Sequence, residues 1–396
     1  MKKTVLIICN NHLNKAPRFL MEVEALKSDF SIIAAGLAVS KINNDFQFVQ
    51  LGTINNSEIT FHANYPMLIR KFFSFIIKYF YKREFTSIHK FENKYNSKES
   101  KNELKKLGKL KFELIVTHHL DSLPMAVRLS KSKNVPLVFN AHEYYPRQFE
   151  SRLTWIKYTQ PEYLYIANKY LPQVNQMLTV CEGIKKEYKK SFGVDSEVIY
   201  NSKKYYPDLN PSLVSESAIR MVHHGVAIRE RHLEEMIKMM EFLPDNYELT
   251  LILFPTQIDY YEELKSMASD SGKIVFEDIV DVDQIVINLN RFDIGLYILK
   301  NSSFNHEYAL PNKVFEFVQA RLCLAISPNK EMKRLVDKYD LGVVSEDFTA
   351  KTMANRISAL SLQDIQKYKN NSHLNAKELG SESSELTILN EVKRLL

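Results

Sequence analysis

The chain has 396 residues, of which 45% are hydrophobic and 25% are charged, and its formal net charge is +6. Single hydrophobic cores stop growing at roughly 250–300 residues, so this length predicts two domains of an ordinary globular protein. The chain contains only 10 glycines. It has no glycine-rich loop of the dinucleotide-binding or NTPase type, which argues against a hydride-transfer enzyme or a P-loop ATPase.

The first apolar run, residues 5–9, ends too early for a secretory leader and predicts a buried first strand. The cysteines are Cys9, Cys181 and Cys323, which are odd in number, far apart and each inside an apolar segment. This pattern predicts reduced core thiols in a cytoplasmic protein, with neither a disulfide nor a metal site.

Short apolar runs alternate with amphipathic stretches along the chain, which predicts an α/β fold with parallel sheets. Helices are expected at 18–27, 122–130 and 184–190. Strands are expected at 5–9, 31–35, 46–51, 113–117, 136–140, 177–180 and 197–200, and again at 219–223, 249–253, 273–276, 293–298, 322–327 and 341–344.

A polar stretch, residues 201–217, separates the two series of strands, and its prolines and lack of periodicity predict a linker. We therefore expect two doubly wound, Rossmann-like domains, 1–200 and 218–375, that face each other across a cleft. Residues 376–396 are expected to form a helix that could pack back on the first domain. In such sheets ligands bind outside the carboxyl ends of the strands.

Residues 66–83 form an amphipathic pattern with a basic face and an aromatic face. They lie in the most basic part of the chain, since residues 66–109 contain twelve Lys or Arg and four Glu. The pattern fits a helix in a membrane interface equally well as a helix packed on its own sheet, and its charges are too frequent for a membrane span. No nucleic-acid-binding motif accompanies it, so nucleic acid is not expected as a partner. The residues expected to face the membrane are Arg70, Lys71, Lys78 and Lys82.

Polar side chains follow two strands of the first domain. His142 and Glu143 come directly after the strand 136–140, and His118, His119 and Asp121 follow the strand 113–117. A histidine beside a glutamate can take or orient a proton, although such a pair is more often structural. Two neighbouring strand ends that both carry histidine favour a functional site.

Two segments of the second domain suit a phosphorylated ligand. Gly225 follows a strand and allows a ligand to approach the backbone, and Arg229 and Arg231 precede a helix expected from about residue 230. The alternative is an arginine-capped surface turn. Lys313 and Glu316 share one face of a helix expected at 312–320, where the alternative is a solvated ion pair.

Taken together and in this order, the motifs resemble those of GT-B glycosyltransferases, in the retaining, family 4-like group of bacterial polysaccharide assembly. HHGVAIRERHLEEMI resembles the opening of the group's donor domain, and LPNKVFEFVQARLCLAIS resembles its donor-binding helix. NAHEYYP resembles the strand end near the reacting sugar, VIYNSKK the crossover into the linker, and KAPRFLMEVEAL the first loop and helix.

The resemblance implies roles for individual residues. Arg231 and Lys313 would neutralise the leaving diphosphate without a metal or another cofactor, Glu316 would bind ribose, and His142 would contact the transferred sugar. Relatives often carry a further glutamate eight residues before the ribose-binding one, where this chain has Tyr308 beside Glu307. The remaining candidates are Gly225, Arg229, Glu307 and Asn312 for the donor, and Arg18, His118, His119 and Asp121 for the acceptor or cleft.

The motif Asp281-Val-Asp283 is expected to cap a helix and not to bind a metal. The resemblance implies a hexosyltransferase that moves a sugar from a UDP- or GDP-sugar to a glycan or lipid-linked acceptor in the biosynthesis of bacterial surface polysaccharide such as capsule. It would act in the cytoplasm at the inner face of the membrane. The resemblance implies that the anomeric configuration of the transferred sugar is retained. If the configuration were inverted, Glu143 or His142 would be the general base. The alternatives are a nucleotide-sugar epimerase of the same fold and a catalytically silent subunit that binds a partner glycosyltransferase.

Overall fold

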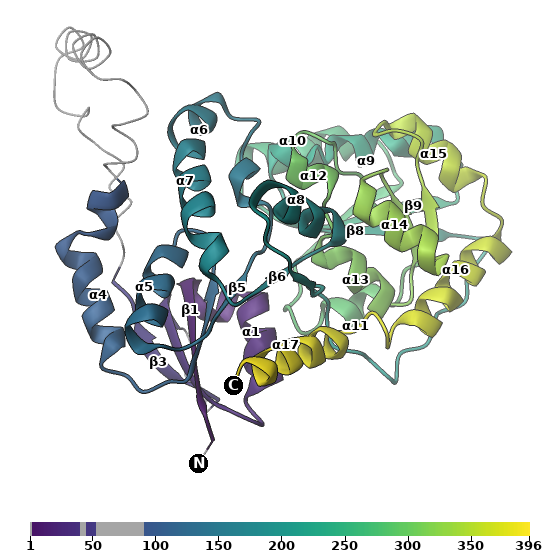
Figure 1. The fold of residues 1–396 in the computed structure, drawn as a ribbon. Helices are drawn as coiled ribbons and strands as arrows, with labels where there is room; N and C mark the ends of the chain where they lie inside the picture. The colour runs from purple at the N-terminus through teal and green to yellow at the C-terminus, as the bar shows by residue number, and fades with distance from the viewer. Residues whose placement is uncertain (1, 40–44, 53–90) are drawn as a thin grey trace, which may run out of the picture. The chain divides into compact units, whose positions relative to one another are not determined.

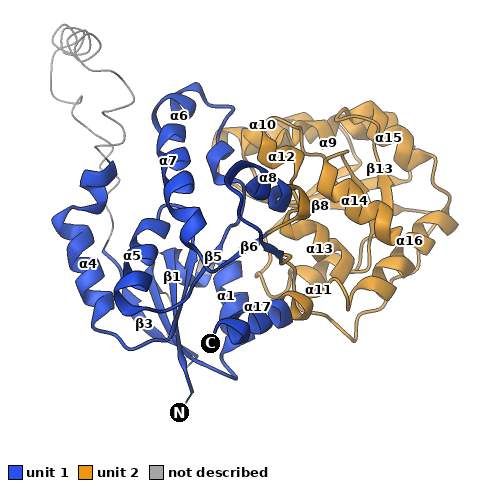
Figure 2. Cartoon of the chain, viewed as in Figure 1, with its two compact units in different colours: residues 1–179, 184–198, 385–396 blue, residues 180–183, 199–384 orange. Residues whose placement is uncertain are grey.

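The computed structural model describes residues 2–39, 45–52 and 91–396. The chain divides into two compact units (Figure 2): unit 1 comprises residues 1–179, 184–198 and 385–396, and unit 2 comprises 180–183 and 199–384. The linker predicted at 201–217 is grouped with unit 2, and the last twelve residues are grouped with unit 1. The basic segment 66–83, with Arg70, Lys71, Lys78 and Lys82, lies outside the described residues.

Unit 1 is built on a parallel sheet with the strand order β3-β2-β1-β4-β5-β6-β7. Val5 of β1 pairs with Ile32 on one side and with Leu114 on the other, so the order reverses between β1 and β4. This reversal is the place where doubly wound sheets bind ligands. The strands are β1 (Thr4–His12), β2 (Ser31–Ala38), β3 (Gln47–Gln50), β4 (Leu114–His118), β5 (Leu137–Asn140), β6 (Gln176–Thr179) and β7 (Glu197–Val198).

Helices flank this sheet as the right-handed crossovers of parallel strands require. α4, α5 and α7 lie together on one side of the sheet (Figure 1). The end of α17 lies near the end of α1, where Lys393 pairs with Asp29 at 2.8 Å. The helices are α1 (Pro17–Leu26), α4 (Lys98–Gly108), α5 (Leu123–Lys133), α6 (Leu153–Tyr158), α7 (Gln160–Tyr170), α8 (Glu182–Phe192) and α17 (Ser381–Leu395).

Unit 2 repeats the same topology with the order β10-β9-β8-β11-β12-β13. Gly295 of β11 allows the close approach of α13, because a Cβ there would lie 2.4 Å from the Phe317 ring. The strands are β8 (Ile219–Val226), β9 (Tyr247–Phe254), β10 (Ile274–Glu277), β11 (Ile294–Tyr297), β12 (Cys323–Ile326) and β13 (Gly342–Val344). The helices are α9 (Glu234–Met239), α10 (Ile258–Ala268), α11 (Ile285–Leu289), α12 (Phe304–Glu307), α13 (Asn312–Gln319), α14 (Lys330–Tyr339), α15 (Ala350–Ser358) and α16 (Leu362–Asn375).

Every strand predicted from the sequence is present, and the two doubly wound sheets confirm the predicted fold class. Three helix predictions were wrong. The helix expected from residue 230 begins at Glu234, because Arg229–Arg231 form a 3-10 turn that ends at His232 with φ 50°. The C-terminal helix begins at Ser381 and not at residue 376. Asp281 and Asp283 do not cap α11, whose N-cap Gln284 makes no side-chain capping bond.

The cysteines at positions 9, 181 and 323 are all buried and unbridged. No helix in the described part of the chain combines the length and the hydropathy needed to cross a membrane.

Candidate functional site

The first cluster of predicted residues lies where β8 and β11 end, at the point where the strand order of unit 2 reverses. Gly225, near the end of β8, has φ +142°, a backbone conformation that favours glycine. A Cβ at this position would lie 3.1 Å from both Arg231 Nη1 and Lys313 Nζ. The missing side chain therefore leaves room beside two cationic groups.

Lys313 is the centre of this cluster and is only 6% exposed. Its Nζ donates to the His224 carbonyl oxygen at 2.8 Å and lies 4.2 Å from the centre of the Tyr297 ring. Nζ is also 3.4 Å from His223 Nε2, an acceptor because His223 Nδ1 donates to the Leu296 carbonyl. Among the described residues no carboxylate forms an ion pair with Lys313.

Burial and then the charge of Arg231 lower the pKa of Lys313 well below its ordinary value. Burial likewise lowers the pKa of His223, and the Lys313 charge adds to this effect. An unpaired ammonium in a buried site is unfavourable unless an anion joins it. The cluster is therefore built to accept a negatively charged group.

Glu316 is also buried, at 5% exposed, but it does not pair with Lys313. Its carboxylate lies 3.2 Å from His224 Nε2 and 3.6 Å from Lys203 Nζ. Burial raises the pKa of Glu316, but His224, Lys203 and Lys313 together outweigh this effect and hold the pKa below its ordinary value. The alternative of a solvated Lys313–Glu316 pair is therefore wrong. The two side chains lie on one helix and have different partners.

Three further predicted donor residues have partners of their own. Arg229 Nη2 pairs with Glu263 at 2.6 Å on the surface, with both side chains about half exposed. Glu307 pairs with Lys330, and Asn312 Oδ1 accepts from Asn201 Nδ2 at 2.6 Å. The structure thus brings Gly225, Arg231, Lys313 and Glu316 together, and it directs Arg229 and Glu307 to other partners.

Tyr308, where the resemblance drawn from the sequence implies a glutamate, directly follows α12. Its ring lies 4.6 Å from the ring of Phe304, and a Cβ at Gly183 would lie 1.9 Å from it. Its hydroxyl accepts from Lys330 Nζ at 3.1 Å. The residue is thus held by packing and by a surface lysine.

The second cluster lies in unit 1 at the ends of β4 and β5. His118 is fully buried, and its two ring nitrogens have different partners. Nε2 lies 2.7 Å from Glu22 Oε2, and Nδ1 lies 2.9 Å from His142 Nε2. Burial, with the charge of the nearby Arg18, lowers the pKa of His142 well below its ordinary value. His142 is therefore neutral at physiological pH.

The buried carboxylate of Glu22 has a second partner, because Asn140 Nδ2 donates to its Oε1 at 2.5 Å. Arg18 Nη1 in turn donates to Asn140 Oδ1 at 2.6 Å. Neither Glu22 nor Asn140 was among the residues predicted from the sequence. The available signal was the spacing of Arg18 and Glu22, four residues apart on the same face of a helix.

The other predicted residues of unit 1 surround this network. His119, with φ 61°, has Nδ1 3.1 Å from the Tyr145 hydroxyl, and its ring centre lies 4.6 Å from that of His142. Asp121 Oδ2 accepts from Asn10 Nδ2 at 3.2 Å. Glu143 accepts from Gln148 Nε2 at 2.6 Å, and burial raises its pKa to about 7.

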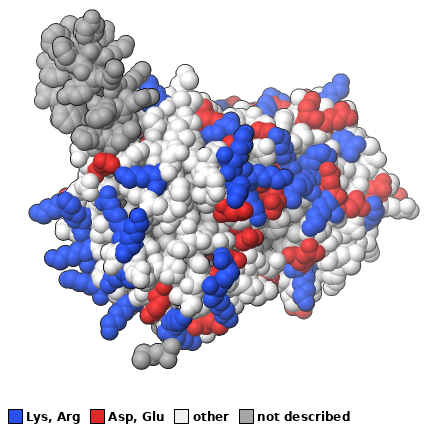
Figure 3. Space-filling model, viewed as in Figure 1, with Lys and Arg blue, Asp and Glu red and all other residues white. Residues whose placement is uncertain are grey.

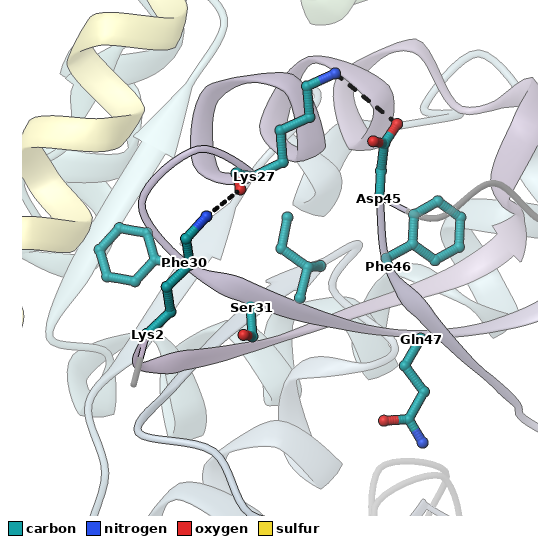
Figure 4. Close-up of a pocket in the computed structure, with 8 residues that line it drawn as sticks. Lys2, Lys27, Phe30, Ser31, Asp45, Phe46 and Gln47 are labelled. Carbon is teal, nitrogen blue, oxygen red and sulfur yellow. Dashed lines mark hydrogen bonds and ion pairs between the residues drawn. The ribbon is translucent and has the colours of Figure 1, made fainter.

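One hollow among the described residues lies elsewhere. It is at the amino end of β2 (Figure 4), where Lys27 and Asp45 are 3.8 Å apart. Parallel α/β sheets bind ligands at the opposite edge, so we assign no function to this hollow. Within the same described residues, no group of three or more His, Cys, Asp or Glu could hold a metal ion.

Comparison with known proteins agrees with the fold. Residues 79–202 match the family model described as Glycosyltransferase Family 4. No curated protein matches the sequence. Similar solved structures include Anabaena HepE in complex with UDP-glucose, with 12% identity, coverage of 99% of this chain and 100% of that chain, and a TM-score of 0.67.

Two further structures are similar over nearly their whole length. Sucrose-phosphate synthase from Thermosynechococcus elongatus has 11% identity, coverage of 99% of this chain and 98% of that chain, and a TM-score of 0.70. WaaG, a glycosyltransferase involved in lipopolysaccharide biosynthesis, has 10% identity, coverage of 97% and 99%, and a TM-score of 0.62. The fold is therefore that of the GT-B proteins. The match to the Glycosyltransferase Family 4 model over residues 79–202 agrees with the resemblance predicted from the sequence.

Proposed function

We propose that this chain transfers a hexose from a UDP- or GDP-sugar to a glycan or a lipid-linked acceptor in the biosynthesis of bacterial surface polysaccharide. Unit 2 binds the donor, and unit 1 binds the acceptor. The observation that carries the proposal is the buried ammonium of Lys313, which forms no ion pair with a carboxylate of the described chain. The UDP-glucose of HepE and the lipopolysaccharide role of WaaG support the choice of donor and acceptor.

The chemistry follows from the charges of unit 2. Departure of a nucleoside diphosphate builds negative charge on the leaving phosphate, and Lys313 and Arg231 stabilise that charge without a metal. Glu316 accepts hydrogen bonds from the two ribose hydroxyls, because an ionised carboxylate offers only acceptors. In unit 1, His142 contacts the sugar as a neutral imidazole.

A nucleotide-binding screen tests this proposal. UDP, GDP and their sugars are added to the full chain, and the melting temperature is followed. A nucleotide at 100 times its Kd should add about 2.7 kcal/mol of stability. Glu316→Gln should weaken this effect, and Glu263→Gln, at an exposed glutamate of the same unit, should not. Absence of stabilisation by every nucleotide would refute the proposal; a positive result leads to turnover assays with lipid-linked acceptors.

We also propose that the enzyme works at the inner face of the cell membrane. The described end of the basic stretch 66–109 supports this, because α4 exposes Lys98, Lys101, Lys105 and Lys106, and Lys and Arg gather over this helix in Figure 3. Flotation with liposomes that contain anionic lipid is the direct test. Binding that is unchanged after neutralisation of Arg70, Lys71, Lys78 and Lys82 would remove the contribution of segment 66–83.

Tyr308 favours one alternative, a catalytically silent subunit that binds a partner glycosyltransferase. Such a subunit has no use for donor contacts. Replacement of Lys313 or Glu316 by Ala would then leave its partner binding and the activity of the complex unchanged. Loss of activity in these variants supports the enzyme instead.

A further inference from the structure

Five side chains from three segments of unit 1 form one continuous hydrogen-bonded chain. It runs from Arg18 to Asn140, then to Glu22, His118 and His142, with successive distances of 2.6, 2.5, 2.7 and 2.9 Å. Arg18, Glu22, Asn140 and His118 are at most 2% exposed. The geometry therefore isolates the chain from water except at its His142 end.

Arg18, the first member of this hydrogen-bonded series, determines which group donates and which accepts in every bond that follows. Arginine only donates, so Asn140 presents its oxygen to Arg18 and its amide nitrogen to Glu22. The Glu22 carboxylate only accepts, so His118 carries a proton on Nε2. His118 Nδ1 is then free to accept the proton of His142 Nε2.

The charges of the cluster agree with a neutral His118. Arg18 already balances the negative charge of Glu22 through Asn140, and a second buried cation would leave a net charge away from water. With His118 neutral, His142 donates through Nε2 and carries a lone pair on Nδ1. Among the hydrogen bonds of the described residues, none involves His142 Nδ1.

We propose that Glu22 and His118 are positioning residues that hold His142 in its Nε2–H form, so that His142 Nδ1 accepts a hydrogen bond from a substrate hydroxyl. This inference rests on the proposed function for the identity of the substrate, a sugar. It adds a polarity to the site: His142 recognises a hydroxyl that donates, and it rejects a group that only accepts. Glu22, the middle member of this hydrogen-bonded series, sets that polarity.

The tautomers can be read directly by ¹⁵N NMR of the full chain labelled at histidine. In the wild type, His118 and His142 should each carry a proton on Nε2 alone. In Glu22→Gln, Asn140 Nδ2 should still donate to the side-chain oxygen of the new glutamine. The glutamine NH₂ group then points at His118 Nε2 and donates to it. Both histidines should change to the Nδ1–H form. Glu24→Gln, an exposed neighbour on α1 that pairs with Lys27, should change neither spectrum.

A doubly protonated His118, or a wild-type His142 that is protonated on Nδ1, would overturn the proposal. So would a folded Glu22→Gln variant with unchanged tautomers. Because the wild-type spectrum alone decides the assignment, the proposal can fail even if the variant does not fold. The spectrum needs no turnover, so its result is separate from success or failure of the proposed transfer reaction.

Once a donor is found, fluorinated donors test the consequence for catalysis. Fluorine accepts but does not donate, so one singly fluorinated donor sugar should react about tenfold more slowly with the wild type, the effect of one lost hydrogen bond. Glu22→Gln should lose or reverse this preference, and Glu24→Gln should keep it. Equal discrimination by the wild type and Glu22→Gln would overturn the inference.

Discussion

Replacement of Lys313 by Met gives the sharpest test of the donor site. Met has a similar length and fills the same space beside Tyr297, but it removes the ammonium that lies 4.2 Å from that ring. A hydrogen bond to a charged group is worth about 1.5–3 kcal/mol. At about 1.4 kcal/mol for each factor of ten, the affinity for UDP should fall roughly 10- to 150-fold.

Titration calorimetry with UDP measures this loss, and Arg229→Ala is the matched control. Arg229 forms an exposed pair with Glu263, and such pairs contribute about 0–1 kcal/mol. It should therefore change UDP affinity by less than about fivefold. Equal losses for the two variants, or an unchanged affinity in Lys313→Met, would refute our assignment of the phosphate site.

The same variant makes an independent prediction about stability and pH. Burial, followed by Arg231, places the pKa of Lys313 below its ordinary value. The unfolded chain therefore binds more protons between the folded pKa and the ordinary value of about 10.4. The free energy of unfolding should rise with pH across this window in the wild type relative to Lys313→Met. Denaturant unfolding at several pH values measures the difference, and a parallel pH dependence would contradict it.

Two further predictions concern ionisable groups outside the donor site. Burial raises the pKa of Glu143 from 4.5 to about 7, so the folded state binds the extra proton in this window and the wild type loses stability as pH rises through it. Glu143→Gln should match the wild type at pH 4 and exceed it in free energy of unfolding above pH 7; a pH-independent difference would contradict this. Lys369 and Asp293 form a fully buried pair at 2.9 Å, so Lys369→Met should cost about 3–5 kcal/mol in denaturant unfolding, and Lys369→Met with Asp293→Asn should recover part of it. A loss below about 1 kcal/mol would show that the pair is not important for stability.

The strands could be predicted because a parallel strand that is buried on both faces appears in the sequence as a continuous apolar run. Residues 5–8 of β1, for example, are all fully buried. Once the strands are placed, their polar carboxyl ends follow from the chain order. This is why Gly225, His118 and His142 could be selected from the sequence, whereas Lys313 was selected from its helix and from the resemblance of its motif.

Helix ends and buried partners were harder to predict. His232 adopts a left-handed backbone conformation although it is not a glycine, so the sequence gives no signal for it. The start of α9 was therefore predicted at about residue 230, and the helix begins at Glu234. Glu22 was missed because its importance depends on His118 and Asn140, which are about a hundred residues away in sequence. Local spacing shows that Arg18 and Glu22 share a face, but only the fold shows that this face meets the ends of β4 and β5.

Tyr308 is the clearest departure from the motifs that the sequence resembles, and its surroundings indicate what it changes. The Tyr308 ring fills the space over Gly183. Lys330 binds both the Tyr308 hydroxyl and the Glu307 carboxylate. Tyr308 therefore offers no carboxylate to Lys313 or its neighbours, and the carboxylate of Glu307 is paired with Lys330 instead. Lys313 and Arg231, the two cations proposed to bind phosphate, have no contact with position 308 in the described hydrogen bonds and ion pairs. We therefore expect the departure to leave nucleotide binding intact and to affect how the rest of the donor is held. For this reason nucleotide affinity and sugar transfer have to be measured separately, since a silent subunit with an inherited nucleotide site would pass the first test and fail the second.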